Sequence, residues 1–419
     1  MSNISKSGAG LRFDKPVDIT KYPVEPPIFL QEKAVTRRPF YPLLRVTKRS
    51  RKKKRRGRKS RIICYASHQE TLVFSWYAYI LSYFYEKEIS ASPLNDSVIG
   101  YRCLNGKDTI DLASGFFRRL ADGKVWRVFA IDVKDFYGSL DHARVKDTWC
   151  RLLNTERLSP DQYAVFSSVT DARVLNKNSI QEAMRKEGVK PPKGILCTIG
   201  DAKRLLEKKR LHWTSHTKDV RRGKGIPQGL AISPVLSNAF MYSFDLVVSA
   251  MTKKRGGHYL RYADDVIVAI PEDTAKDLNV VEYLEEQLRK VDLELSEGKT
   301  QERTIQYRDG RFSILNEKGE EDELDYLGLV FSSKGVCVRK KTITKFGHRV
   351  RRVAYAISFG YRSKRSGIRA VRLKVREPNY ILRVDRKIDN LGGLIEKSEN
   401  NKRTAHRARS KILNALLKN

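Results

Sequence analysis

Three aspartates in two short segments have the residue types and surroundings that metal-dependent chemistry needs. Asp264 and Asp265 are adjacent in the segment Tyr262-Ala-Asp-Asp265, and apolar residues flank the pair. Like charges this close raise each other's pKa unless a cation compensates. Oxygen ligands without histidine or thiolate favour Mg²⁺, with Mn²⁺ as an alternative. Asp132 ends a second apolar stretch and could complete the same site.

Three carboxylates of this kind suit two-metal phosphoryl transfer, in which one ion activates the attacking hydroxyl and the other stabilises the leaving pyrophosphate. Alone, Asp264-Asp265 would favour an ordinary hairpin turn, because Asp is common in turns. Its order along the chain after Asp132 and after Gly225-Ile-Pro-Gln-Gly229 favours catalysis instead. The other polar residues beside the first aspartate are expected to be structural: Asp135, Asp141 and His142.

Strands and helices predicted around these residues would position them. Residues 126–142 have a strand pattern in which apolar side chains alternate, and residues 258–270 predict two strands about a tight turn that carries the aspartate pair. Ser233-Pro234 predicts a helix start with Ser as the N-cap. The remaining predicted elements are helices at 71–88, 106–119 and 278–291, and a hairpin over 324–338 that turns at residues 332–335.

The charge of the chain indicates a polyanionic partner. Its 419 residues include 83 Lys and Arg against 48 Asp and Glu, which leaves a net charge of +35. Nucleic acid is the partner that such an excess favours, and an anionic membrane surface is the weaker alternative. At 40% hydrophobic residues, the chain can bury a core, so wholesale disorder is not expected.

Two segments hold most of the excess charge. Eleven of the 14 residues from 48 to 61 are Lys or Arg, and residues 334–419 contain 25 basic and five acidic residues. We interpret the first as a clamp on phosphates and the second as a folded basic helical module. A solvated tail or a localisation-like signal is the alternative for residues 48–61.

The five cysteines lie far apart with no C-x-x-C pair, so neither a zinc site nor a disulfide framework is expected. The N-terminal residues lack an apolar signal-peptide core, and the most apolar window, residues 72–85, is too short to cross a bilayer. We therefore expect a soluble, cytoplasmic protein with no membrane partner.

Six ordered motifs resemble those of reverse transcriptases, specifically the bacterial branch that contains group II intron, retron and phage-defence enzymes. The resemblance covers roughly residues 58–335. It rests on Lys59-Ser-Arg61, on Asp132, on Gly225-Ile-Pro-Gln-Gly229 with Ser233-Pro234, on Tyr262-Ala-Asp-Asp265, on Leu295-Ser-Glu-Gly-Lys-Thr300 and on Tyr326-Leu-Gly-Leu329.

The resemblance implies a role for each matching residue. Asp132, Asp264 and Asp265 would be catalytic, and two Mg²⁺ ions would be held by Asp132, Asp264 and the Val133 carbonyl, with Asp265 in support. The implied nucleotide-binding residues are Lys59, Arg61, Tyr137, Gln228 and Lys299, although an ordinary surface lysine stays an alternative for Lys299. The Tyr137 ring would clash with a 2′-hydroxyl, so dNTPs should be preferred over NTPs. Tyr326, Leu327 and Gly328 would form the primer grip.

The fold that the resemblance implies is a right-hand polymerase of the α+β class. Its expected parts are an N-terminal arm with the basic run at 1–57, fingers at 58–125, the first part of the palm at 126–142, an insertion at 143–224, the second part of the palm at 225–338 and a basic helical thumb at 339–419. Nucleic-acid contacts are expected from the basic segments, at Arg51, Lys52, Lys53, Lys54, Arg55, Arg56, Arg349, Arg351 and Arg352.

The subclass is predicted by elimination. The chain carries no Cys/His-rich endonuclease module and lacks the Asn-Ala-x-x-His and Val-Thr-Gly signatures of retron enzymes. A stand-alone defence-associated enzyme that copies a partner noncoding RNA into DNA from dNTPs is therefore expected. Two alternatives are an intron-type maturase acting as an RNA chaperone, and a catalytically dead polymerase fold that only binds RNA.

Overall fold

The computed structural model describes residues 12–15, 17, 28–49, 60–102, 104, 109–216, 222–333, 335–339, 344 and 348. The chain divides into two compact units, and each is assembled from three separate segments. Unit 1 comprises Met1–Asn95, Val133–Val247 and Glu286–Leu295, and unit 2 comprises Asp96–Asp132, Val248–Glu285 and Ser296–Asn419. The segment predicted as the first part of the palm is therefore divided after Asp132.

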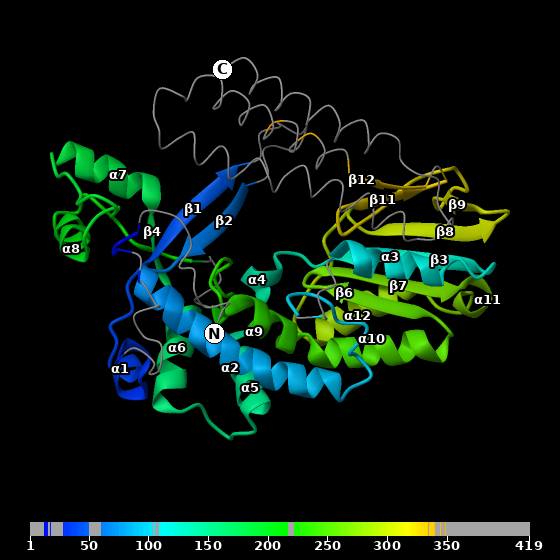
Figure 1. Cartoon of the computed structure of the whole chain (residues 1–419), viewed down its shortest axis with the longest axis horizontal. Coiled ribbons are helices and arrows are strands. Elements are labelled where there is room, and N and C mark those ends of the chain that lie inside the picture. The colour runs from blue at the N-terminus through cyan, green and yellow to red at the C-terminus, as the bar shows by residue number, and fades with distance from the viewer. Residues whose placement is uncertain are drawn as a thin grey trace, which may run out of the picture. The chain divides into compact units, whose positions relative to one another are not determined.

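Unit 1 combines one mixed sheet with several helices (Figure 1). The sheet has the order β2-β1-β4-β5, in which β1 is antiparallel to β2 and parallel to β4. Its strands are β1 (Leu43–Arg49), β2 (Ser60–Tyr65), β4 (Arg173–Asn176) and β5 (Thr214–Ser215). Its helices are η2 (Ile28–Leu30), α1 (Glu32–Thr36), α2 (His68–Ser90), α4 (Phe136–Ser139), α5 (His142–Leu153), α6 (Pro160–Thr170), α7 (Lys177–Lys186), α8 (Ile199–Glu207) and α9 (Ser233–Phe240).

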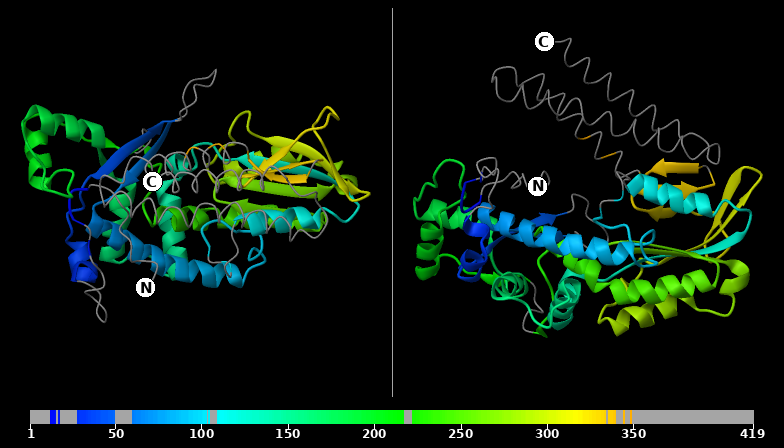
Figure 2. Two further views of the ribbon diagram at one scale, coloured as in Figure 1. Left: turned by 45° about the horizontal axis from the view of Figure 1, so that its top comes forward. Right: turned by 60° about the horizontal axis from the view of Figure 1, so that its bottom comes forward.

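The long helix α2 organises the helical part of unit 1, and both views of Figure 2 show it running unbroken. The Ser67 side chain caps its N-terminus by accepting a hydrogen bond from the Glu70 N–H at 3.2 Å. Helix α2 packs against α5 and α9. The predicted helix at 71–88 is thus present and extends three residues further at its start.

Residues 28–49, which belong to the N-terminal arm expected at 1–57, contain helices and a strand. Helix α1 packs against α6, and β1 forms ladder hydrogen bonds with two neighbouring strands. Leu44 of β1 joins a buried cluster with Leu175 of β4 and residues of α7 and α8. Residues 28–49 are therefore an integral part of unit 1, because apolar side chains between the prolines find partners distant in sequence.

Glu70 is a buried carboxylate of α2 whose charge opposes folding. Burial raises its pKa to about 7, despite hydrogen bonds from the Tyr41 and Ser67 backbones and the nearby charge of Arg38. The pKa of Glu70 in the folded protein exceeds its value in the unfolded chain. Ionisation of Glu70 therefore lowers the unfolding free energy as pH rises from about 4.5 to 7. We expect Glu70→Gln to raise the unfolding free energy by roughly 2 kcal/mol at pH 8 and by nearly nothing at pH 4. Urea melts of both proteins across this range test the expectation, and a pH-independent difference would contradict it.

Unit 2 is built on a five-stranded antiparallel sheet of order β6-β7-β3-β8-β9 and a three-stranded sheet of order β10-β11-β12 (Figure 1). Its strands are β3 (Val125–Asp132), β6 (His258–Tyr262), β7 (Asp265–Pro271), β8 (Gln301–Arg308), β9 (Arg311–Leu315), β10 (Leu324–Tyr326), β11 (Leu329–Ser332) and β12 (Gly335–Val338). Its helices are α3 (Thr109–Arg119) and α11 (Glu272–Ala275), while α10 (Tyr242–Lys254) and α12 (Val280–Lys290) each have residues in both units.

The central strand β3 differs from the alternating pattern predicted for it. Residues 128–131 are all buried, because β7 and β8 flank the strand and both of its faces are covered. The core on one side contains Phe116 and Phe117 of α3, and the Phe117 ring stacks on Phe331 of β11 with ring centroids 3.3 Å apart. Because the sheets are antiparallel in unit 2 and mostly antiparallel in unit 1, and helices accompany them in both units, the predicted α+β class is confirmed.

Two predicted elements are subdivided in the structure. The helix that starts at Ser233 ends at Phe240, and α10 follows after a bend of 48°. Its N-cap is Ile232, since the Ser233 hydroxyl donates instead to the Pro227 carbonyl at 2.7 Å. The hairpin predicted over 324–338 is a three-stranded meander with an additional turn at Leu327-Gly328.

Within the described part of the chain, no single helix has both the length and the apolar composition of a membrane span. The bent pair α9 and α10 meets those criteria only when taken together.

Candidate active site

Strand pairing in unit 2 brings the three predicted catalytic aspartates together. Asp132 is the last residue of β3 and lies directly opposite Asp265, the first residue of β7. Tyr262 is the partner of Asp265 on β6, so Ala263 and Asp264 form a two-residue hairpin turn. The predicted tight turn is present, and it places Asp264 next to the pair.

Asp132 is held by residues of the segment that follows α12. Its Oδ2 accepts hydrogen bonds from the Ser296 hydroxyl at 2.6 Å and from the Lys299 ammonium. The Ser296 N–H also donates to the Asp132 carbonyl at 2.8 Å. These contacts fix the carboxylate orientation and give it a cationic neighbour. Lys299, predicted to lie near the nucleotide phosphates, is placed by the structure on the carboxylate itself.

The electrostatics of the cluster are those of carboxylates crowded together. Burial raises the pKa of Asp265 to about 6, and the charges of Asp264 and Asp132 add to the effect. The cations of Arg339 and Lys299 oppose it. The positive charges of Arg339 and Lys299 therefore stabilise the ionised form of Asp265.

Divalent metal ions fit the chemistry of this donor set. Carboxylate oxygens are the ligands that Mg²⁺ and Mn²⁺ prefer, and three of them meet at the ends of β3 and β7. Among the described residues, however, no three His, Cys, Asp or Glu side chains already have the arrangement of a metal site. Oδ2 of Asp132 faces the Lys299 ammonium and the Ser296 hydroxyl.

A buried arginine and a glycine support the turn that carries Asp264. Arg261 is fully buried, and its Nη1 donates to the Ala263 carbonyl at 3.0 Å. Ala263 has φ of +56°, a left-handed conformation that costs energy for any residue with a side chain. Gly100 lies so close that a Cβ there would be 2.6 Å from the Ala263 nitrogen. The segment before Gly100 is anchored to β6, since the Ile99 N–H donates to the Arg261 carbonyl at 2.9 Å.

Backbone hydrogen bonds in unit 1 connect three segments predicted to bind nucleotide. The Ile226 N–H donates to the Tyr137 carbonyl at 2.8 Å, and the Cys64 N–H donates to the Gln228 carbonyl at 2.8 Å. Cys64 lies on β2, the strand that also carries Arg61. The predicted residues Tyr137, Gln228 and Arg61 thus belong to one connected framework within this unit.

Glycine is required at the junction between the Gln228 loop and β2. Gly229 has φ of +115°, and a Cβ there would lie 2.6 Å from the Cys64 carbonyl oxygen. At the other end of the loop, the Gly225 carbonyl accepts hydrogen bonds from ring nitrogens of His142 at 2.7 Å and His216 at 2.9 Å. His142 is thus structural, as predicted. Asp141 also has a structural role, since its carboxylate caps α5 at the Arg144 N–H.

The predicted primer-grip residues form the turn between β10 and β11. Leu327 has φ of +48° and Gly328 has φ of +89°. Tyr326 is buried in the core of unit 2, and its hydroxyl has no hydrogen-bond partner among the described residues. The Arg339 N–H donates a hydrogen bond to the Gly328 carbonyl at 3.0 Å, and this bond helps to hold the turn in place.

Several predicted binding residues lie outside the described residues. They are Lys59, Arg51, Lys52, Lys53, Lys54, Arg55 and Arg56 of the basic run, and Arg349, Arg351 and Arg352 of the predicted thumb. Val133, the predicted source of a carbonyl ligand, is buried and forms an isolated bridge with Leu295 in unit 1.

Sequence reasoning missed three residues that position the carboxylates: Ser296, Arg261 and Gly100. Ser296 lies in the same motif as Lys299, three residues before it, and only the lysine was singled out. A charged residue inside the apolar strand β6 was a detectable signal for Arg261. Nothing in the sequence marks Gly100, because its role arises from a contact with a residue more than 160 positions away.

A family model described as reverse transcriptase (RNA-dependent DNA polymerase) matches residues 104–331, which is more than half of the chain. The chain belongs to the reverse transcriptase family. This match confirms the family and the polymerase fold that the sequence predicts. The matched segment includes all three aspartates, Tyr137, Gln228, Lys299 and the primer-grip turn.

Solved telomerase structures are similar at low sequence identity. Apo telomerase from Candida tropicalis is 13% identical, with a TM-score of 0.48 and with 95% of this chain and 66% of that chain covered. Telomerase from Candida albicans in complex with a fragment of telomeric RNA is 12% identical, with a TM-score of 0.41 and coverage of 95% and 63%. The C. tropicalis enzyme truncated from its C-terminal domain is 14% identical, with a TM-score of 0.43 and coverage of 71% and 57%. This chain thus spans less than two thirds of the length of these telomerases.

Proposed function

We propose that this reverse transcriptase copies a bound noncoding RNA into DNA by two-metal nucleotidyl transfer, as a defence-associated member of the bacterial branch that contains group II intron and retron enzymes. The observation that carries the catalytic part is the pairing of Asp132 with Asp265 across β3 and β7, with Asp264 in the adjoining turn. The RNA part is supported by the net charge of +35, which favours a structured polyanion.

In this proposal, Asp132 and Asp264 hold Mg²⁺ together with the Val133 carbonyl, and Asp265 contributes negative charge beside them. When bound, the metal stabilises the attacking 3′-hydroxyl and the leaving pyrophosphate. Ser296 and Lys299 keep the Asp132 carboxylate in one orientation, and Arg261 preserves the turn that carries Asp264. Tyr137 contacts the sugar of the incoming dNTP, and Gln228, Arg61 and Lys59 contact the nucleotide or its phosphates.

DNA synthesis on co-purified RNA tests this function. Purified protein is supplied with labelled dNTPs and Mg²⁺, and both the retained RNA and any DNA product are sequenced. We expect DNA complementary to one predominant noncoding RNA. Retention of RNA without any dNTP incorporation would instead favour the chaperone or the catalytically dead alternative.

The defence role calls for a separate measurement. Cells that express the chain with its own flanking RNA are challenged with phages, and plaque formation is compared with that of cells expressing an Asp264→Ala/Asp265→Ala double variant. We expect protection only with the wild type. Equal plaque counts across a broad phage panel would remove the defence role while leaving the polymerase activity intact.

Substitution of Tyr137 tests the proposed sugar contact. We expect Tyr137→Ala to incorporate rNTPs more readily relative to dNTPs, by roughly tenfold or more, because the aromatic obstacle to the 2′-hydroxyl is removed. Phe136→Leu is the matched control, since Phe136 is the neighbouring buried aromatic of α4. The ratio of kcat/KM for dTTP and rUTP is the measurement, and an unchanged ratio in Tyr137→Ala would remove the assignment.

A further inference from the structure

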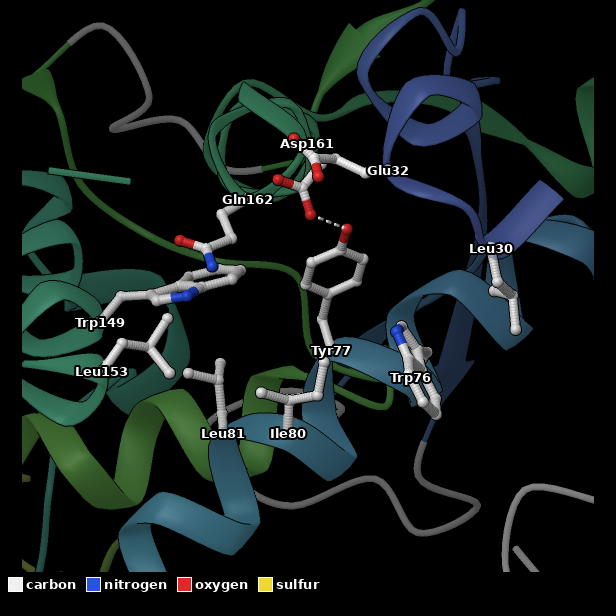
Figure 3. Close-up of a pocket in the computed structure, with 10 residues that line it drawn as sticks. All are labelled: Leu30, Glu32, Trp76, Tyr77, Ile80, Leu81, Trp149, Leu153, Asp161 and Gln162. Carbon is white, nitrogen blue, oxygen red and sulfur yellow. Dashed lines mark hydrogen bonds between the residues drawn. The ribbon is translucent and has the colours of Figure 1, made fainter. Parts of the chain in front are cut away.

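A cavity of about 160 Å³ lies within unit 1, and none of the residues proposed for the polymerase site lines it. Residues of η2, α1, α2, α5 and α6 line it. Figure 3 shows three aromatic side chains around it, namely Trp76 and Tyr77 of α2 and Trp149 of α5. Trp149 is fully buried and Tyr77 nearly so, and their ring centroids are 6.4 Å apart. A cavity of similar volume in another protein is large enough to bind benzene.

Two carboxylates converge at the polar end of this cavity. Asp161 accepts a hydrogen bond from the Tyr77 hydroxyl (Figure 3). It also accepts one from the Ser159 hydroxyl at 2.5 Å. The Glu32 carboxylate lies close enough for its charge, together with burial and Asp161, to raise the pKa of Tyr77. Tyr77 therefore stays a neutral donor, so its hydrogen bond orients Asp161 without neutralising it.

The charge of the lining is opposite to that of the chain. Among the described residues that line the cavity, two are carboxylates and none is Lys, Arg or His. Neither Glu32 nor Asp161 forms an ion pair within the described part of unit 1, although the whole chain has 83 basic and 48 acidic residues. Asp161 lies in the first turn of α6, where the helix dipole favours a negative charge.

Aromatic rings combined with carboxylates that form no ion pair are the chemistry that recognises organic cations. The faces of Trp and Tyr rings attract alkylammonium and guanidinium groups, and quaternary ammonium ligands are bound in aromatic cages of this kind. We propose that this cavity binds the alkylammonium or guanidinium head group of a small organic cation, against Trp76 and Tyr77 and beside Glu32 and Asp161, with Trp149 packed behind Tyr77. An inorganic cation would gain little from the apolar side chains of Leu81 and Leu153 that complete the lining.

Titration of the purified full-length protein with model cations tests the proposal. Tetramethylammonium and guanidinium are compared with their neutral counterparts, tert-butanol and urea, by saturation-transfer NMR and by tryptophan fluorescence, which Trp76 and Trp149 should report. We expect saturable binding of at least one cation, and at least about tenfold weaker binding of its neutral counterpart.

Charge-neutralising variants locate the binding. We expect the double variant Glu32→Gln/Asp161→Asn to bind the cation at least about tenfold more weakly than the wild type, because both carboxylates lose their charge while the amide oxygen introduced at position 161 can still accept from Tyr77. Glu182→Gln is the matched control, since Glu182 is an exposed acidic residue of α7 outside the cavity, and it should bind as the wild type does. If the double variant is unfolded, Glu32→Gln alone serves, because Glu32 is exposed on α1 and its neutralisation should weaken binding by roughly threefold.

Three results would overturn the proposal: no saturable binding of either cation, equal binding of a neutral counterpart, or unchanged cation affinity in the folded charge-neutralising variant. Equal binding of tert-butanol would identify the cavity as an apolar site. None of these measurements uses polymerase activity, so their outcome is independent of the proposed function.

Discussion

Asp132→Asn is expected to reduce DNA synthesis by about a thousandfold or more. Asparagine is nearly isosteric with aspartate and can still accept the Ser296 hydrogen bond, so the end of β3 should keep its structure. It has no negative charge, however, with which to bind a divalent cation or to pair with Lys299. The loss should therefore appear in kcat for dNTP incorporation, with nearly unchanged affinity for the co-purified RNA.

Asp141→Asn is the matched control for this substitution. Asp141 lies nine residues further along the chain and caps α5 with its side chain, a role that asparagine fills as well as aspartate. The control should retain wild-type activity and stability. A rate for Asp132→Asn within tenfold of the wild type would show that the carboxylate pair of β3 and β7 is not the catalytic centre.

Gly100→Ala is expected to lower DNA synthesis by at least about tenfold through the turn that carries Asp264. The added methyl group would lie 2.6 Å from the Ala263 nitrogen and 3.2 Å from the Tyr262 carbonyl carbon. Both neighbours are backbone atoms, so the overlap must be relieved by moving either the hairpin or the segment before Gly100. Because Asp264 follows Ala263 directly, such a shift displaces a catalytic carboxylate without altering its chemistry.

Gly115→Ala provides the comparison for Gly100→Ala. Gly115 is in α3, and a Cβ there meets nothing within 4 Å, so alanine should stabilise the helix by about 0.5–1 kcal/mol and leave the rate unchanged. Thermal melting and dNTP incorporation are measured for both variants. Wild-type activity in Gly100→Ala would mean that the hairpin accommodates the methyl group and that Gly100 has no positioning role.

The catalytic hairpin could be predicted from sequence because its information is local. The apolar runs on both sides of Tyr262-Ala-Asp-Asp265 predict two strands, and a two-residue turn follows from their spacing. Asp132 could be placed with them only through the resemblance, since no local pattern pairs β3 with β7. The α+β class is likewise implied by the resemblance.

Other features depended on contacts between distant residues. The sequence predicts an N-terminal arm at 1–57, and the strand β1 within it could not be predicted because it is stabilised by pairing with β2 and β4, which lie further along the chain. The alternation expected in β3 failed because a central strand covered on both faces needs no polar face. Ser233 has the residue type of an N-cap, but its hydroxyl donates to Pro227 instead, so the helix begins one residue earlier than a Ser cap would predict.

The pairing of β3 also has a consequence for biosynthesis. Both of its neighbours lie far downstream, since β7 begins at Asp265 and β8 begins at Gln301. At typical translation rates, roughly 10 to 30 s separate the emergence of β3 from that of β8. Both edges of this apolar strand are unsatisfied until β7 emerges, and one edge stays unsatisfied until β8 follows. Such a segment aggregates or recruits chaperones. We therefore expect the yield of folded protein to rise with chaperone supply and with slower growth at low temperature. The net charge of +35, which favours solubility, would not by itself predict this dependence.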